Sequence, residues 1–104
     1  MRISIVGDIP DEESYIHLID TFVKDHKVGT PVILSAGTVA TMHQVDKWAK
    51  GKGYDSVLLG NVLPLAILNG DKIVLIWDGE NKKYEEVLDL CKKEKRAYME
   101  IRTK

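Results

Sequence analysis

The sequence predicts an α/β protein, a three-layer sandwich with a five-stranded, mainly parallel sheet. Two observations predict this class. Short apolar segments alternate with longer segments of helical periodicity along the 104 residues, and the apolar segments carry almost no polar side chains. Strands of that kind are buried on both faces, as in parallel sheets that helices cover on both sides. No linker, repeat or low-complexity segment interrupts the pattern, so we expect a single domain over residues 1–104.

The first part of the chain predicts a strand, a helix and a second strand. Residues 3–6 are mostly β-branched and are followed by Gly7 and Asp8, as a buried strand is before a loop. Residues 11–26 have apolar side chains at helical spacing, with acidic residues in the first turn and lysines near the end, which suits the helix dipole. Residues 31–34 are short and apolar again and predict the second strand.

The middle of the chain predicts a loop, two helices and a strand. Residues 35–38 are small or polar and predict a loop into a second helix, which glycines stop at 51–53. Residues 56–59 read Ser-Val-Leu-Leu and predict a third buried strand. Residues 61–68 predict a short helix, in which Pro64 is tolerated only in the first turn.

The last part predicts a strand, a turn, a helix and a closing strand. Residues 72–77 read Lys-Ile-Val-Leu-Ile-Trp and are the strongest strand in the chain. A polar turn at 78–81 separates this strand from a helix over 82–95 that has one apolar face. Residues 97–101 then predict the fifth strand.

Composition excludes several classes of protein. Hydrophobic residues make up 44% of the chain and charged residues 30%, with a net charge of −1 and a pI of about 6.3, so no basic field attracts DNA, RNA or an anionic membrane. The single cysteine excludes a disulfide framework and a multi-cysteine metal site. No apolar stretch approaches the ~20 residues of a membrane span, and the first residues lack a secretory signal. We therefore expect a cytoplasmic protein with no metal and no cofactor.

Candidate ligand-binding residues follow the expected strands, because ligands of open parallel sheets bind beyond the carboxyl ends of the strands. Four loops each place a glycine near a polar residue: Gly7–Asp8, Ser35–Thr38, Gly60–Asn61 and Asp78–Asn81. Glycine lets backbone N–H groups approach a ligand, and a helix N-terminus favours anions. The sequence contains neither G-x-G-x-x-G nor G-x-x-x-x-G-K-[ST], which excludes the usual dinucleotide and Walker-type sites.

The loop before the second helix is the best of the four. Ser35, Thr38 and Thr41 supply three hydroxyls around Gly37, where a phosphate fits. The alternative is that Thr38 only caps the helix and Ser35 only ends the strand. If the phosphate site exists, replacing Gly37 by a bulky residue weakens ligand binding tenfold or more, about 1.4 kcal/mol, and changes melting little.

Other chemically distinctive residues have two interpretations. Trp77 ends a strand beside the candidate site and either stacks on a base or packs inside. Cys91 lies on the apolar stripe of the last helix and is expected as a small buried hydrophobe, since no histidine accompanies it. His17 and His26 lack metal-binding spacing and are expected on helix surfaces, whereas His43 either faces a ligand or lies on the surface.

Two stretches resemble a known family. Residues 35–53, SAGTVATMHQVDKWAKGKG, are similar to the S-G-G-A-x-G-A-D…A-x-x-x-G segment of the SLOG superfamily. Residues 72–101 are similar to its second signature, in which a strand ends in F-W-D-G and a loop and helix lead to the last strand. The resemblance spans most of the chain and points to the small YspA-like branch. It implies a Rossmann-like domain with strand order 3-2-1-4-5 and a nucleotide or nucleotide-derived ligand.

The match to the family is partial. The motif positions are kept at Ser35, Gly37, Asn61, Trp77, Asp78 and Gly79. Ala40 and Met42 replace a Gly and an Asp of the first motif, and Lys83 and Tyr84 stand at the place of a G-T pair. The loop with which enzymes of the family cleave nucleoside monophosphates has no good counterpart in this chain.

Three functions stay open. A non-catalytic module would sense or sequester a nucleotide-derived ligand, with its phosphate at 37–41 and Asp78–Gly79 across the cleft. A protein-interaction subunit would keep the fold after losing its ligand site. A phosphoribohydrolase-type enzyme would need an acid such as Asp78 or Glu86 and a cation on the phosphate, and no arginine lies in the candidate loops. The absence of that cation argues against catalysis.

We also expect the chain to form a homodimer. Small domains of the resembled family often pair through helices, and this chain carries more apolar helix surface than one sheet face needs. Tyr15, Met42 and Trp48 are the candidate contact residues.

Overall fold

The protein's structure is a computed structural model that describes residues 1–104, with five strands and four helices in alternation. The strands are β1 (Arg2–Gly7), β2 (Val32–Gly37), β3 (Asp55–Leu58), β4 (Lys72–Trp77) and β5 (Ala97–Arg102). The helices are α1 (Glu13–His26), α2 (Val39–Gly51), α3 (Leu63–Asn69) and α4 (Lys82–Lys93). This order confirms the predicted βα alternation.

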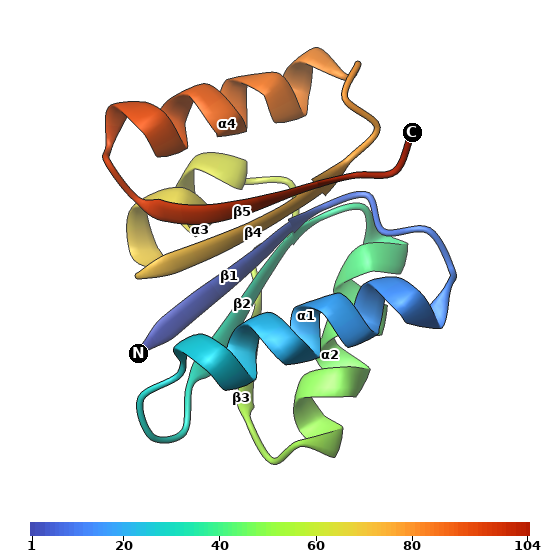
Figure 1. Ribbon diagram of the computed structural model, residues 1–104, viewed down its shortest axis with the longest axis vertical. Helices are drawn as coiled ribbons and strands as arrows, with labels where there is room; N and C mark the ends of the chain where they lie inside the picture. Colours follow the sequence, from blue (N-terminus) through green and yellow to red (C-terminus); the bar gives the residue numbers. More distant parts are fainter.

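All five strands are parallel and lie in the order β3-β2-β1-β4-β5. The α/β class and the strand order 3-2-1-4-5 are therefore confirmed. Figure 1 shows the amino ends of the strands on the side of the N-terminus and the carboxyl ends on the side of the C-terminus. Since the chain leaves β3 at one edge and crosses to β4, the direction of winding reverses between β1 and β4.

The helices cover the sheet on both faces (Figure 1). Successive side chains of a strand point to opposite faces, so Ile5 and Val6 of β1 lie in different hydrophobic clusters. The cluster of Ile5 is closed by α1 and α2, and the cluster of Val6 is closed by α3 and α4. The result is a three-layer sandwich, as predicted.

Three expected element boundaries or burial patterns are wrong. β2 does not end at residue 34, because Ser35, Ala36 and Gly37 continue its pairing with β1. β3 is not buried on both faces: it has one neighbouring strand, and Val57 and Leu58 are 43% and 46% exposed. The last helix ends at residue 93 rather than 95, since the positive φ of Lys95, 53°, is not helical.

Gly7 and Gly37 bring the carboxyl ends of β4, β1 and β2 unusually close together. They pair with each other across β1 and β2, and both have positive φ, 141° and 125°. A Cβ at Gly7 would overlap the carbonyl oxygen of Ile76, and a Cβ at Gly37 would overlap that of Gly7. Only glycine fits both positions. Asp8 N–H donates to the Ile76 carbonyl at 2.9 Å and Thr38 N–H to the Gly7 carbonyl at 3.3 Å, so the pairing continues past the strand ends.

Candidate functional site

A hollow lies at the carboxyl ends of β1, β4 and β5, where the winding of the sheet reverses and where open α/β sheets bind their ligands. We call it the switch-point hollow. Its volume is about 290 Å³. It is lined by Asp8, Pro10, Asp78, Asn81, Tyr84, Thr103 and Lys104. Figure 1 shows the C-terminus running past the ends of β1 and β4 on this side of the sheet. Of the predicted site residues, Asp8 and Asp78 are therefore brought together, from loops that are distant in the sequence.

Tyr84 lines the hollow but was not among the predicted ligand contacts. It begins the buried stripe of α4, is only 3% exposed, and its hydroxyl has no hydrogen-bond partner in the protein. Burial raises the pKa of Tyr84, and the negative charges of Asp8 and Asp78 raise it further. The hydroxyl is therefore a protonated donor, close to two carboxylates and free to bind a ligand. A tyrosine in the first turn of a helix that follows a central strand was the available signal.

Asp78 is held by its own turn. Its Oδ1 accepts the N–H groups of Glu80 at 2.9 Å and of Asn81 at 3.0 Å, and these two bonds keep the pKa of Asp78 below its usual range. Asn81 in turn caps α4 by accepting the Lys83 N–H at 3.0 Å. The carboxylate is thus ionised and fixed in place, and Oδ2 stays available to a ligand. Asp8 is exposed and its side chain has no partner in the protein.

At the predicted phosphate site before α2, most of the hydrogen-bonding groups are already bound within the protein. The Gly37 N–H donates to the Gly60 carbonyl at 3.0 Å, and the Thr38 N–H is bound to Gly7. The Thr38 hydroxyl caps α2 by accepting the Thr41 N–H at 3.2 Å, as the alternative interpretation had it. Only the N–H groups of Val39 and Ala40 in this first turn have no acceptor in the protein. The start of α2 can therefore offer two free amides to an anion, but not those of Gly37.

Two of the predicted hydroxyls are inside the protein. Thr41 is fully buried and its Oγ1 accepts the Ile9 N–H at 2.8 Å, so it anchors the loop after β1 to α2. Ser35 is fully buried in β2, and its hydroxyl has no partner. Neither lines the switch-point hollow.

Trp77 is also unavailable to a ligand. Only 2% of it is exposed, and its indole N–H donates to Glu100 at 2.6 Å. The guanidinium of Arg102 lies 5.5 Å from the ring centre and its Nε donates to the same carboxylate at 2.9 Å. Stacking of Trp77 on a base is therefore contradicted by its burial. Burial alone would raise the pKa of Glu100, but these hydrogen bonds outweigh it and hold the pKa below its usual range.

Arg102 is the one arginine near the carboxyl ends of the sheet. Its side chain lies against Gly79, so an arginine approaches one of the candidate loops although none lies within them along the sequence. Arg96 is at the opposite end, where it donates to the carbonyls of Leu68 and Gly70. Because Arg102 is engaged by Glu100 and Trp77, it supports β5 rather than facing the hollow.

Asn61 lies in a different hollow from the other predicted residues. It accepts a hydrogen bond from Lys83 Nζ at 3.2 Å and lines a space of about 340 Å³ between α3 and α4. Gly60 contributes its carbonyl to Gly37 rather than to a ligand. The predicted four-loop pocket is thus divided: two loops line the switch-point hollow, Asn61 lines the space between α3 and α4, and the loop at 35–38 lines neither.

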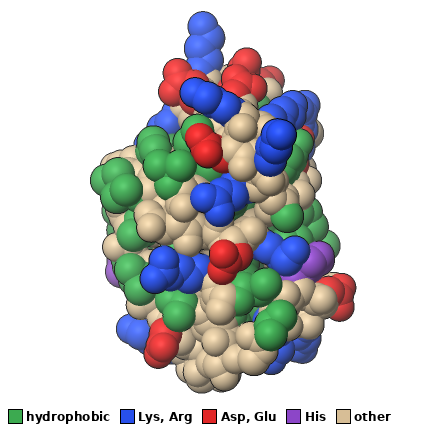
Figure 2. All heavy atoms as spheres, turned by 90° about the vertical axis from the view of Figure 1, so that its left-hand side faces the viewer, with side chains coloured by type: hydrophobic (Ala, Val, Ile, Leu, Met, Phe, Trp, Pro, Cys, Tyr) green, Lys and Arg blue, Asp and Glu red, His purple; other side chains and the backbone are tan.

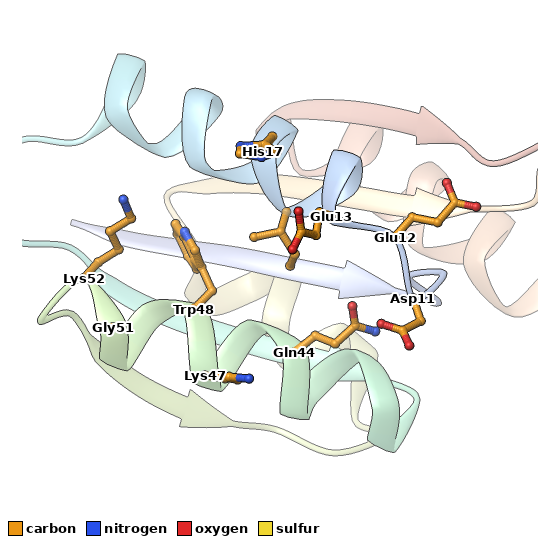
Figure 3. Close-up of a pocket in the computed structure, with 10 residues that line it drawn as sticks. Asp11, Glu12, Glu13, His17, Gln44, Lys47, Trp48, Gly51 and Lys52 are labelled. Atoms are coloured by element: carbon orange, nitrogen blue, oxygen red, sulfur yellow. The ribbon is translucent and has the colours of Figure 1, made fainter.

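A larger groove of about 540 Å³ runs between α1 and α2 (Figure 3). Figure 3 shows Glu13 and Trp48 pointing into this groove and Lys47 lying on the side of α2 away from α1. At its base the Trp48 indole donates to Asp20 at 3.2 Å, and Lys24 and Lys52 pair with the same carboxylate. These contacts hold α1 to α2 and account for the arrangement without a ligand.

The remaining predicted groups behave as surface or core residues. His17, His26 and His43 are all exposed, and no group of three or more His, Cys, Asp or Glu side chains is arranged to hold a metal. Burial raises the pKa of Cys91 to about 11, which makes its thiol inert at neutral pH. Figure 2 shows the side at the amino ends of the strands, where acidic, basic and hydrophobic side chains are interspersed without an extended basic surface. None of the helices is both long and apolar enough to cross a bilayer.

Comparison with protein families, with curated proteins and with solved structures finds no match for this chain.

Proposed function

We propose that the chain is a non-catalytic module that binds a small nucleotide-derived molecule, with a hydroxyl- or amine-bearing part of the ligand in the switch-point hollow. The observation that carries the proposal is the hydroxyl of Tyr84, which lines the hollow together with Asp8 and Asp78 and has no hydrogen-bond partner in the protein. A ligand that enters the hollow can supply that partner.

The donors and acceptors of the hollow match a sugar diol. The carboxylates of Asp8 and Asp78 accept hydrogen bonds from hydroxyls, as acidic residues do for ribose in dinucleotide-binding sheets. The Tyr84 hydroxyl donates one in return. An amine would also donate hydrogen bonds to these carboxylates, so the thermal unfolding experiment compares nucleosides with simple amines.

The phosphate of such a ligand would lie at the start of α2. The free N–H groups of Val39 and Ala40 and the positive end of the helix dipole favour an anion there. α2 follows β2, which lies next to β1 in the sheet. The start of α2 therefore lies at the carboxyl ends of the strands, where the hollow also lies. The resemblance of residues 35–53 and 72–101 to the SLOG superfamily supports the same class of ligand.

Thermal unfolding with a panel of nucleosides, nucleoside monophosphates, cyclic dinucleotides and simple amines tests the proposal. A ligand at 100 times its Kd adds about 2.7 kcal/mol of stability, and each kcal/mol raises Tm by roughly 4–8 °C for a domain of this size. We expect the nucleoside-containing compounds to give a shift and the amines to give a smaller one. No shift with any compound at millimolar concentration would overturn the proposal.

Matched variants locate the binding. Tyr84→Phe removes only the hydroxyl and Asp8→Asn only a charge, and each is expected to weaken binding about tenfold, ~1.4 kcal/mol. Asp11→Asn is the control, because Asp11 is an equally exposed acid that lies outside the hollow. Equal binding by Tyr84→Phe, Asp8→Asn and the control would refute the hollow as the site. Release of free base from a nucleoside monophosphate would refute the non-catalytic part.

A further inference from the structure

Exposed hydrophobic side chains gather on β3 and α3. Ten large hydrophobic residues of the chain are exposed, and half of them lie between residues 57 and 68. They are Val57, Leu58, Val62, Leu65 and Leu68, each between 43% and 51% exposed. We call them the β3–α3 patch. Monomeric proteins rarely leave large apolar patches exposed to water.

Four of the five side chains lie on the α3 side of the sheet. Val62, which precedes α3, and Leu65 and Leu68 of α3 recur every three residues on the exposed side of the helix, while Leu63, Ala66 and Ile67 are buried beneath it. α3 packs over β1 and β2 and leaves β3 uncovered. Val57 pairs with Leu34 and shares its side of the sheet, the side of α3, and Leu58 faces the other way at the same edge.

The edge strand β3 lacks the protection that the other edge has. β3 pairs only with β2, so the backbone groups on its outer side have no strand partner. Proteins usually protect such an edge with charged side chains. The opposite edge, β5, carries Glu100 and Arg102, whereas β3 has one charged residue, Asp55 at its start, and residues 56–70 have none. Residues 28–42 are also uncharged, but they include the inner strand β2, in which five of the six residues are buried.

We propose that the β3–α3 patch is the contact surface between two copies of this chain. A surface without charge offers nothing to select a charged partner, but it complements itself, which is what a two-fold interface requires. Homodimer interfaces are also the class that is most apolar and most depleted of charge. Two-fold pairing sets the outer edges of two β3 strands side by side, joins the two sheets and packs α3 against its copy.

The proposal moves the expected contact away from α1 and α2. Tyr15, Met42 and Trp48 are all partly buried, and Tyr15 and Trp48 pack against the core under α1 and α2. Their burial within one copy leaves little for them to contribute to a second. The β3–α3 patch is also independent of the switch-point hollow, so either proposal can fail without the other.

Sedimentation or light scattering of the intact chain at tens of micromolar tests the proposal. We expect a dimer for the wild type. Leu68→Lys on α3 and Val57→Lys on β3 place a charge in the patch and are each expected to raise the dissociation constant at least tenfold. Leu18→Lys is the matched control, because Leu18 on α1 is exposed to the same 46% as Leu68 but lies outside the patch.

The outcomes separate cleanly once circular dichroism shows that each variant is folded. A wild-type monomer at these concentrations overturns the proposal and leaves the patch for a different protein. A dimer that Leu18→Lys weakens as much as Leu68→Lys and Val57→Lys overturns the choice of surface. A dimer that only the two patch variants dissociate supports it.

Discussion

Replacing Gly37 by alanine tests the close approach of β1 and β2. The residue has a φ of 125°, and a Cβ there would overlap the carbonyl oxygen of Gly7. Two other glycines separate these effects. Gly29 has a positive φ of 67° but nothing within 4 Å of its Cβ position, and Gly51 has neither a positive φ nor a neighbour. Alanine at position 51 therefore adds no strain. Alanine at 29 adds backbone strain only, and alanine at 37 adds both backbone strain and an overlap with the Gly7 carbonyl.

The expected costs follow from these contacts. Gly29→Ala costs about 1–2 kcal/mol, the strain of an L-residue at positive φ. Gly37→Ala adds displacement of the Gly7 carbonyl, which weakens the bonds from Thr38 N–H to Gly7 and from Gly37 N–H to Gly60, each about 1 kcal/mol. The sum is about 3–4 kcal/mol, a large part of the ~5–15 kcal/mol that stabilises a domain. Gly51→Ala gains up to about 1 kcal/mol because it lies in a helix.

Urea unfolding of the three variants, at one protein concentration and with a common slope, measures these differences. The expected order of stability is Gly51→Ala, wild type, Gly29→Ala, Gly37→Ala. If Gly37→Ala unfolds within about 1 kcal/mol of Gly29→Ala, the overlap is relieved at no cost and the reasoning is refuted. The same series shows that a bulky residue at Gly37 is no clean test of ligand binding, contrary to the expectation from the sequence, because it disturbs the sheet itself.

Three further predictions concern single side chains. Thr38→Ala removes the cap of α2 and is expected to cost about 1 kcal/mol in urea unfolding, whereas Thr38→Ser keeps the acceptor and costs less; equal losses would contradict the cap. Cys91, with a pKa of about 11, is expected to resist iodoacetamide at pH 8 and to react only as fast as the chain unfolds; rapid alkylation of the folded protein would refute its burial. The lowered pKa of Glu100 means that its ionised form stabilises the fold above the ordinary pKa of 4.5 and that this contribution is lost as the pH falls through the folded pKa. Glu100→Gln is therefore expected to reduce the fall in Tm on acidification, and an unchanged profile would count against the Trp77 and Arg102 bonds.

The fold could be predicted because its signals are local. Apolar runs such as residues 72–77 and the helical spacing of 11–26 do not depend on what they pack against. The burial of β3 was predicted wrongly for the opposite reason. Residues 56–59 are as apolar as an inner strand, but β3 lies at the sheet edge, and α3 packs over β1 and β2 and leaves Val57 uncovered.

The candidate site could be predicted only in part. Loops after parallel strands meet at one end of the sheet, so Asp8 and Asp78 were found correctly as neighbours. The state of the predicted phosphate site could not be foreseen, because the sequence does not show that the Gly37 N–H donates to the Gly60 carbonyl. Tyr84 fits the apolar stripe of α4 as well as it fits a ligand contact. Only the structure, which places Asp8 and Asp78 near its hydroxyl, points to the ligand contact.

The backbone bonds at the carboxyl ends of the strands also bear on how the hollow opens. The N–H groups of Asp8, Gly37 and Thr38 are bound to carbonyls of neighbouring segments, and that of Thr103 is bound to Trp77 at 2.8 Å. These four amides should exchange with deuterium as slowly as those of the central strands, because they are released only when the sheet separates. Asp8 and Thr103 line the hollow, so its backbone at these two positions is expected to be as rigid as the core. A ligand that needs a wider entrance has to displace the turn at Gly79, where φ is 83° and only the Arg102 side chain lies near the Cβ position.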